Sequence, residues 1–152
     1  MDTLFPQGDK PIGLASDHAG YELKKYIVAL FNEHGIKYID FGTNSPESVD
    51  YPDYAHKLGN AIDNGECGKG IAICGTGNGI NISLNRHKSV RSALCWNTEI
   101  VRLVRAHNDA NVLAMPGRFI TEHEAYDMVV TFFTTEFEGG RHQRRIDKIS
   151  CM

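Results

Sequence analysis

Short apolar stretches alternate along this chain with segments whose apolar residues recur every three or four positions. The apolar stretches lie at residues 12–15, 37–41, 70–74, 90–96 and 112–115. Helical segments lie between them and after them, at Leu23 to Gly35 and at residues 54–64, 79–85, 98–106 and 121–133. Strands separated by helices pair in parallel through right-handed crossovers. The sequence therefore predicts an α/β fold, a three-layer αβα sandwich with a Rossmann-like, five-stranded parallel sheet.

Details of this pattern give finer expectations. The stretch 90–96 is nearly continuous in small and apolar residues, which predicts a strand buried on both faces. Thr98, with Asn97 beside it, is the expected N-cap of the fourth helix. Arg102 and Arg105 are expected on the solvent face of that helix. A short terminal helix should place Arg141 and Arg145 one turn apart on one face.

Length and charge narrow the class of protein. The 152 residues fit one domain, 1–152, with a lead at 1–11 and a C-terminal tail from about 139 to 152. A net charge of −3 gives no global attraction for nucleic acid, so any affinity for anions must be local. The first residues lack the features of a signal peptide, and no apolar run reaches membrane-spanning length, so we expect a cytoplasmic protein with no membrane partner.

The most informative segment is Cys-Gly-Thr-Gly-Asn-Gly, residues 74–79, directly after an apolar stretch. Glycine at every second position leaves successive backbone N–H groups free to face an anion. The thiol of Cys74 supplies a candidate base or nucleophile, and a helix start nearby would favour a thiolate. Cys67, Cys95 and Cys151 lack such surroundings and are expected to be ordinary free thiols, and no cysteine has the spacing of a zinc site.

Three common anion-binding loops do not fit this segment. No Gly-Lys-Ser/Thr follows, as a Walker loop requires. Ile80 stands where a dinucleotide fingerprint has its third glycine, and where a Cys-x5-Arg phosphatase loop has its arginine. The loop is therefore not predicted to hold a nucleotide or a phosphate in any of these ways.

Further candidates should gather at the carboxyl edge of the predicted sheet. They are Asp17-His18, Tyr51, Cys74 to Gly79, Trp96-Asn97 and Met115 to Arg118. Asp17 could orient a sugar hydroxyl or simply cap the next helix. His107 could act in catalysis or be a cationic helix cap, whereas His34, His56, His87 and His123 are interpreted as surface residues. Arg118, Arg141 and Arg145 suit phosphate, although solvated charge is the usual role of a basic cluster.

Five motifs together carry a family resemblance. They are Ser-Asp-His-Ala-Gly at 16–20, Asp-Tyr-Pro at 50–52, the loop at 74–79, His-Asn-Asp-Ala-Asn at 107–111 and Gly-Gly-Arg-His-Gln-Arg-Arg at 139–145. From Ile12 to about Ile149 the chain resembles the type B ribose-5-phosphate isomerases. These belong to a wider family of sugar-phosphate isomerases that includes allose-6-phosphate and galactose-6-phosphate enzymes.

The resemblance implies conversion of an aldose phosphate to its ketose through a cis-enediolate, with no cofactor and no metal, as in the non-oxidative pentose phosphate pathway. It implies that Cys74 moves the proton, Thr76 assists it, and His107 with Asp17 opens the sugar ring. The remaining implied contacts fall into three sets: loop amides that hold the enediolate (Gly75, Thr76, Gly77, Asn78, Gly79), groups that bind phosphate (His18, Arg118, Arg141, Arg145) and groups that contact the sugar (Asp17, Tyr51, Asn108, Asn111).

The family resemblance also bears on the base and on assembly. One branch uses a Glu at the position of Ile80, where this chain has no titratable group, so the resemblance assigns the base to Cys74. Family members are homodimers or dimers of dimers with shared sites. We therefore expect His107, Asn108, Arg118 and the two tail arginines to come from a different chain than Cys74.

Two other functions stay open at this point. One is a hexose 6-phosphate isomerase acting on allose or galactose 6-phosphate, which needs one more carbon between phosphate and carbonyl. The other is a non-catalytic sugar-phosphate sensor or a flavodoxin-like binding module. A sensor should have lost Cys74 or His107, and neither is lost.

Overall fold

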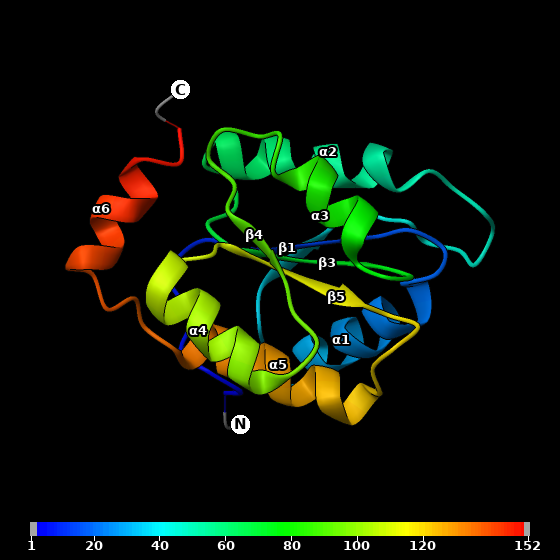
Figure 1. Ribbon diagram of the computed structural model, residues 1–152. Coiled ribbons are helices and arrows are strands. Elements are labelled where there is room, and N and C mark those ends of the chain that lie inside the picture. The colour runs from blue at the N-terminus through cyan, green and yellow to red at the C-terminus, as the bar shows by residue number, and fades with distance from the viewer. Residues whose placement is uncertain (1–2, 151–152) are drawn as a thin grey trace.

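The computed structural model describes residues 3–150 and contains one parallel sheet, with strand order β2-β1-β3-β5-β4 (Figure 1). Every pair of neighbouring strands runs in parallel. The strands are β1 (Ile12–Ser16), β2 (Tyr38–Asp40), β3 (Gly70–Cys74), β4 (Ser92–Leu94) and β5 (Val112–Pro116). The α/β fold with a five-stranded parallel sheet predicted from the sequence is confirmed.

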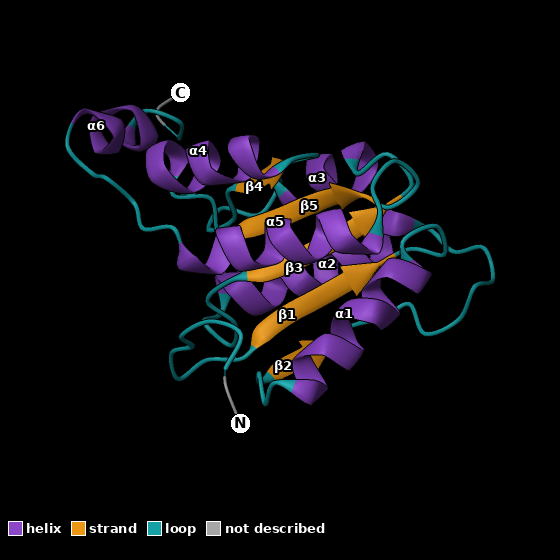
Figure 2. Cartoon of the chain, turned by 90° about the horizontal axis from the view of Figure 1, so that it is seen from below, coloured by secondary structure: helices purple, strands orange, loops and turns teal. Residues whose placement is uncertain are grey.

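Helices cover both faces of the sheet, as Figures 1 and 2 show. They are α1 (Tyr21–Glu33), α2 (Tyr51–Asp63), α3 (Asn78–Leu84), α4 (Thr98–Asn108), α5 (Glu122–Thr134) and α6 (Arg141–Asp147). The helices α2 and α3 lie on one face, α1, α4 and α5 lie on the other, and α6 stands at the end of the molecule beside α4. No helix within residues 3–150 is both long enough and apolar enough to cross a membrane.

The central strands have two different buried faces. In β3, Ile71 and Ile73 pack into the core formed with α1, α4 and α5, while Ala72 and Cys74 pack toward α2 and α3. This follows from the alternation of side chains along a strand. Strand β3 therefore presents Cys74 toward the α2 and α3 side of the sheet. The N-terminal lead also joins the core, since the ring of Phe5 is buried and stacks on Phe133 with ring centroids 4.6 Å apart.

The fourth strand differs from the expectation. It spans only Ser92–Leu94, and these residues are half-buried because β4 is an edge strand whose one strand neighbour is β5. The prediction of a strand buried on both faces was therefore wrong. The cap of α4 was also misplaced by one residue: Asn97, rather than Thr98, is the N-cap, and its side-chain oxygen accepts the N–H of Ile100.

Arg105 does not lie on a solvent face. It is 5% exposed, and its guanidinium donates to Asp109 at 2.8 Å, to the carbonyl oxygen of Ala110 at 2.7 Å and to that of Thr135 at 3.2 Å. The segment after α5 covers this side of α4, which helical periodicity alone does not reveal. Arg102 is exposed, as expected, and pairs with Glu99.

His87 is likewise not an isolated surface histidine. Its Nδ1 lies 3.1 Å from Asp63 Oδ2, its Nε2 lies 2.7 Å from His56 Nδ1, and its side chain is only 12% exposed. The other carboxylate oxygen of Asp63 accepts the N–H of Ser89 at 2.9 Å. Burial alone would raise the pKa of Asp63, but the hydrogen bonds from Ser89 and His87 outweigh it and hold the pKa below its ordinary value.

Replacing Asp63 with Asn should destabilise the protein in a pH-dependent way. A carboxyl whose pKa is lowered by folding contributes stability above its ordinary pKa of ~3.9, and that stability is lost as the pH falls through the lowered value. At neutral pH the loss should be about 1.5–3 kcal/mol, the range for a hydrogen bond to a charged group. Urea unfolding at neutral and acid pH measures it.

The exposed Asp9, replaced in the same way, serves as the control. The difference between wild type and Asp63→Asn should shrink at acid pH, while Asp9→Asn should match wild type throughout. A penalty for Asp63→Asn that stays constant with pH would contradict this account.

Candidate active site

Cys74 is the last residue of β3 and therefore lies at the carboxyl edge of the parallel sheet. The residue is 4% exposed, and the chain turns sharply after it into α3. Gly77 is the N-cap of α3 and has a φ of 79°, a left-handed conformation that favours glycine. A side chain there would also overlap Leu94 and the backbone of Met115. The loop can thus pass close to β4 and β5 only because this position is glycine.

The loop offers unpaired donors beside the thiol. Within residues 3–150, the backbone N–H groups of Gly75, Thr76 and Gly77 have no hydrogen-bond acceptor. The N–H of Asn78 donates to Thr76 Oγ1 at 3.2 Å. Preorganised N–H groups at such a position stabilise negative charge that develops on a bound oxygen. The loop therefore combines a candidate base with a candidate oxyanion site.

Tyr51 and Arg118 enclose this loop from two sides. A methyl group at Gly79 would collide with the ring of Tyr51, so the ring lies directly on the glycine. The N–H of Arg118 donates to the carbonyl oxygen of Gly75 at 3.1 Å, and its guanidinium lies against the same glycine. Both side chains thus belong to the surroundings of Cys74.

The position of Arg118 corrects one expectation. The family resemblance predicts that it comes from a different chain than Cys74, but it lies beside Gly75 of the same chain. The reason is the sheet register: Cys74 pairs with Pro116, so the residues that follow β3 and β5 meet at the same edge.

Asp17 and His18 flank the site at the end of β1. One oxygen of Asp17 accepts the N–H groups of Ala19 and Gly20 at 2.9 and 3.1 Å, which makes it a capping residue of the turn before α1. His18 Nδ1 accepts the N–H of Val49 at 3.2 Å, so in the neutral ring the proton is on Nε2, which can donate to an anion. A pocket of about 490 Å³ lies between these residues and the segment Val49 to Asp53.

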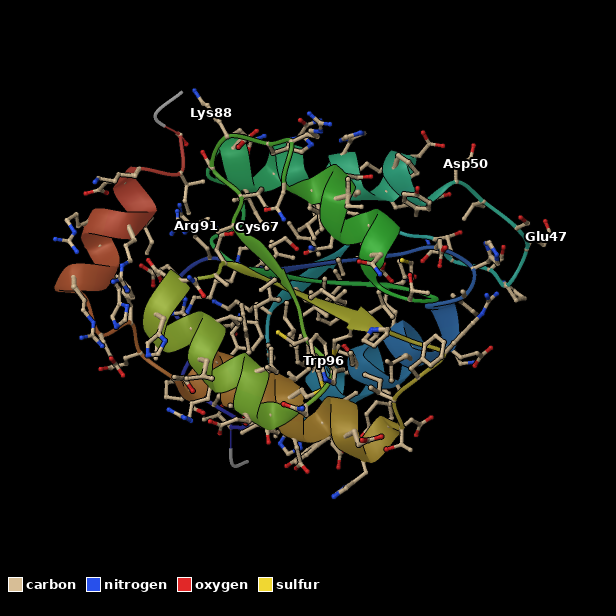
Figure 3. All side chains as sticks on the ribbon, viewed as in Figure 1. Glu47, Asp50, Cys67, Lys88, Arg91 and Trp96 are labelled. Carbon is tan, nitrogen blue, oxygen red and sulfur yellow. The ribbon has the colours of Figure 1, made fainter. Side chains whose placement is uncertain are left out.

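The surface around this pocket is open. The loop that carries Glu47 and Asp50 extends from the right-hand end of the molecule in Figure 3. Trp96, just beyond β4, is 53% exposed. Asn97, expected at this edge, uses its side chain to cap α4.

Five predicted site residues lie elsewhere in the same chain. Asn111 directly precedes β5, and its carbonyl oxygen accepts the N–H of Gly70, the first residue of β3. Cys74 is the last residue of the same strand. At ~3.3 Å per residue, the Gly70 end of β3, where Asn111 lies, is about 13 Å from Cys74. The end of α4 and the start of α6 lie at this opposite end, away from the arrowhead of β5 in Figures 1 and 2. This places His107, Asn108, Asn111, Arg141 and Arg145 away from Cys74.

For three of these five residues the structure shows a local role or an exposed side chain. The side chain of Asn111 accepts the N–H of Arg91 at 2.7 Å and donates to the carbonyl oxygen of Ser89 at 2.7 Å, so it anchors the segment before β4. Arg141 and Arg145, by contrast, are exposed on α6.

His107 lies in a cluster that the sequence analysis did not foresee. Its ring stacks on that of His142, with centroids 4.2 Å apart and planes 13° apart, and Glu138 lies next to both. The separation of Glu138 and His142 by four residues was the available signal, but the intervening double glycine hides it. No spacing rule connects either residue with His107.

The other described cysteines are poor candidates for catalysis. Burial, with a smaller effect of Glu66, raises the pKa of Cys67 to about 11. Burial raises the pKa of Cys95 to about 12. Both thiols are therefore protonated at neutral pH, as the sequence analysis anticipated in treating them as ordinary thiols. Cys151 lies outside the described residues.

Comparison with known proteins now decides the family. The sequence model described as Ribose/Galactose Isomerase matches residues 12–149. The chain belongs to the ribose/galactose isomerase family. Ribose-5-phosphate isomerase B of Escherichia coli K12 is 41% identical over 143 residues, covering 94% of this chain and 96% of the relative.

Solved structures of this isomerase family agree with the fold. A ribose 5-phosphate isomerase from Thermotoga maritima has 47% identity and a TM-score of 0.92, covering 95% of this chain and 100% of that one. Ribose-5-phosphate isomerase B from Mycoplasma genitalium, solved with bound ribulose-5-phosphate, has 40% identity and a TM-score of 0.89, covering 94% and 95%. The predicted resemblance to the type B enzymes is confirmed.

Alkylation should separate the three described thiols. At pH ~8 the raised pKa values leave Cys67 and Cys95 with thiolate fractions of about 10⁻³ and 10⁻⁴. Cys74 directly precedes the loop with unpaired N–H donors, which favour a thiolate. Iodoacetamide should therefore modify Cys74 first in the folded protein. Peptide mass spectrometry after timed labelling measures the order. Labelling of Cys67 or Cys95 in the folded protein as fast as Cys74 would contradict it.

Proposed function

We propose that this chain interconverts ribose 5-phosphate and ribulose 5-phosphate through a cis-enediolate. The observation that supports this most strongly is the pairing of Cys74 with the unpaired N–H groups of Gly75 to Gly77 in a member of the ribose/galactose isomerase family. The reaction needs one group to move a proton between adjacent carbons and another to hold the negative oxygen. The loop supplies both within a few residues.

The proton transfer is assigned to Cys74. As thiolate it removes the proton from C2 of the open-chain aldose, and the C–H electrons form the C1–C2 double bond while the carbonyl oxygen becomes anionic. The thiol then returns the proton to C1, the carbonyl forms at C2, and the hydroxyl proton of O2 passes to O1. Thr76 Oγ1, at the same loop, is the proposed assistant for this last exchange. The sequence of steps is redox-neutral overall.

The enediolate oxygen is assigned to the loop amides. One preorganised N–H donor in an oxyanion site is worth about 3 kcal/mol of transition-state stabilisation. The Tyr51 ring on Gly79 limits where the sugar can lie, and the pocket beside Asp17 and His18 has room for the rest of the substrate. His18 Nε2 and the guanidinium of Arg118 are the proposed same-chain contacts of the phosphate and the sugar oxygens.

The remaining contacts are assigned to a second copy of the chain. His107 would open the sugar ring with Asp17, Asn108 and Asn111 would contact the sugar, and Arg141 with Arg145 would bind phosphate. In one chain these residues lie at the edge of the sheet opposite Cys74. A homodimer, or a dimer of dimers, that joins opposite ends of two chains would complete each site.

Several broader assignments belong to the same proposal. Residues 1–152 would act as one catalytic domain, with the tail from about 139 carrying the phosphate-binding arginines. The enzyme would work in the cytoplasm, in the non-oxidative pentose phosphate pathway, without an organic cofactor or a catalytic metal.

Turnover of candidate substrates tests the proposal directly. The pure protein should form ketose from ribose 5-phosphate faster than from allose 6-phosphate or galactose 6-phosphate, with no loss of rate when a chelator is present. Cys74→Ala should lower kcat by ~10²–10⁴-fold, the range for a general base, because no side chain then accepts the proton from C2 of the sugar. Cys67→Ala, which changes a thiol outside the loop, is the matched control.

Each outcome of that assay is informative. A Cys74→Ala variant that works at the wild-type rate would remove the proposed base. Faster turnover of a hexose phosphate would transfer the assignment to the hexose 6-phosphate isomerases. No turnover of any of the three sugars by folded protein would favour a non-catalytic binding module.

A further inference from the structure

His107, Glu138 and His142 place three metal-binding atoms together at the end of α4. Within residues 3–150, one ligand atom from each of these side chains lies within 4.8 Å of the others. Glu138 Oε1 is 3.8 Å from His107 Nε2 and 3.5 Å from His142 Nε2. We propose that these three side chains form a binding site for a divalent transition metal of the zinc class.

The backbone holds the three residues in this arrangement. The N–H of Glu138 donates to the carbonyl oxygen of Ala106 at 3.0 Å, which fixes Glu138 beside the last turn of α4. The N–H of His142 donates to the carbonyl oxygen of Gly139 at 3.2 Å, and its side chain is buried. Both Nε2 atoms lie near the same carboxylate oxygen, Glu138 Oε1. The two ring planes are 13° apart, so the partly exposed ring of His107 must rotate before both nitrogens point at one ion. The backbone therefore brings the ligands together, and side-chain rotation completes the site.

The spacing suits zinc. Zinc binds imidazole nitrogen and carboxylate oxygen at about 2.0–2.2 Å in a tetrahedral arrangement, which separates neighbouring ligand atoms by about 3.4 Å. The distances from Glu138 Oε1 to the two Nε2 atoms, 3.8 and 3.5 Å, exceed this separation by at most a few tenths of an ångström. Small rotations of the side chains would close that difference. Two His and one Glu with a fourth position open to water is a known zinc ligand set.

A second histidine cluster lacks this convergence of ligand atoms on one point. His56, His87 and Asp63 also lie together, but there the two rings share a hydrogen bond of 2.7 Å between nitrogens. Asp63 contacts Nδ1 of His87, the nitrogen on the far side of the ring from His56. No single ion could reach all three ligands, so this cluster is a hydrogen-bonded chain. It provides a matched control from the same protein.

Metal binding would inhibit the enzyme. This consequence rests on the proposed function, because it follows from the role of His107 in ring opening. A metal on Nε2 removes the lone pair with which the imidazole accepts or relays a proton. The metal would thus be a reversible inhibitor at the partner-facing end of the chain, and would take no part in proton transfer at Cys74.

Direct binding tests the site without reference to activity. A Cys74→Ala, Cys151→Ala chain removes the reactive thiol and the terminal thiol as competing ligands. Zn²⁺ is titrated into this protein against a chromophoric chelator. We expect one Zn²⁺ per chain, with an affinity that falls as the pH is lowered, since imidazole must be unprotonated to bind.

Three variants in that background separate the clusters. Glu138→Gln and, independently, His142→Gln should each weaken Zn²⁺ binding by at least about tenfold, because altering even the supporting shell of a site costs 10–100-fold. His56→Gln should leave the affinity unchanged. Circular dichroism verifies folding, and Co²⁺ absorption in the visible range reports whether the coordination is tetrahedral.

Unchanged affinity in both folded Glu138→Gln and His142→Gln variants, or no binding of Zn²⁺ at micromolar concentration, would overturn the proposal. A loss of affinity in His56→Gln equal to that in His142→Gln would do the same.

Inhibition is measured separately, on chains that retain Cys74. Zn²⁺ should lower the turnover of ribose 5-phosphate, a chelator should restore it, and Glu138→Gln should require at least about tenfold more Zn²⁺ for the same fractional loss relative to its own metal-free rate. If the protein binds Zn²⁺ but turns over no sugar, the proposed function fails and the metal site stands. If it turns over sugar but Glu138→Gln leaves the inhibition unchanged, the inhibitory role fails.

Discussion

Parallel pairing of the strands is the constraint on which the rest of this structure depends. It brings the carboxyl ends of β1, β3 and β5 to one edge, where Cys74, Asp17 and Arg118 meet. It also requires each connecting helix to run back to the other edge. Because α4 runs back from the carboxyl ends of the strands, His107 at its end lies far from them. Cys74, at the end of β3, lies among them. The division of the proposed catalytic groups between two ends is a consequence of the topology.

Elements that depend on local pattern could be predicted from the sequence. Both ends of the strand Gly70–Cys74 follow from the sequence, because its apolar residues stop at the glycine loop. The carboxyl-edge rule predicts that Asp17, Tyr51 and Cys74 lie in one region. In the structure Tyr51 lies against the loop that follows Cys74, and Asp17 lines a pocket together with Tyr51. The family motifs supplied roles that neither periodicity nor spacing could give.

Features that depend on long-range partners could not be predicted. Arg105 is buried because the segment at Thr135 covers it, and His87, in the turn after α3, is half-buried because Asp63 and His56 of α2 contact it. Lys24 lies 2% exposed within α1 and pairs with Asp40. In each case the sequence predicts a solvent-facing polar residue until its distant partner is known.

The opposite end of the sheet has a chemistry of its own. His107 is needed at the reacting sugar in the proposed enzyme, yet in the single chain it stacks on His142 next to Glu138. These neighbours hold the imidazole in a fixed orientation before a second chain arrives. The same three side chains are the proposed zinc ligands, so the orientation of His107 and inhibition by zinc would have one structural origin.

Sharing of the active site between two chains is the central claim, and complementation measures it most directly. A Cys74→Ala chain and a His107→Ala chain, each inactive alone, are mixed, dissociated and reassembled, and the turnover of ribose 5-phosphate is followed. In a mixed dimer one site has both substitutions and the other has neither, so about half of the wild-type activity per mixed dimer should return. Reassembled mixed dimers with no recovered activity would contradict the account.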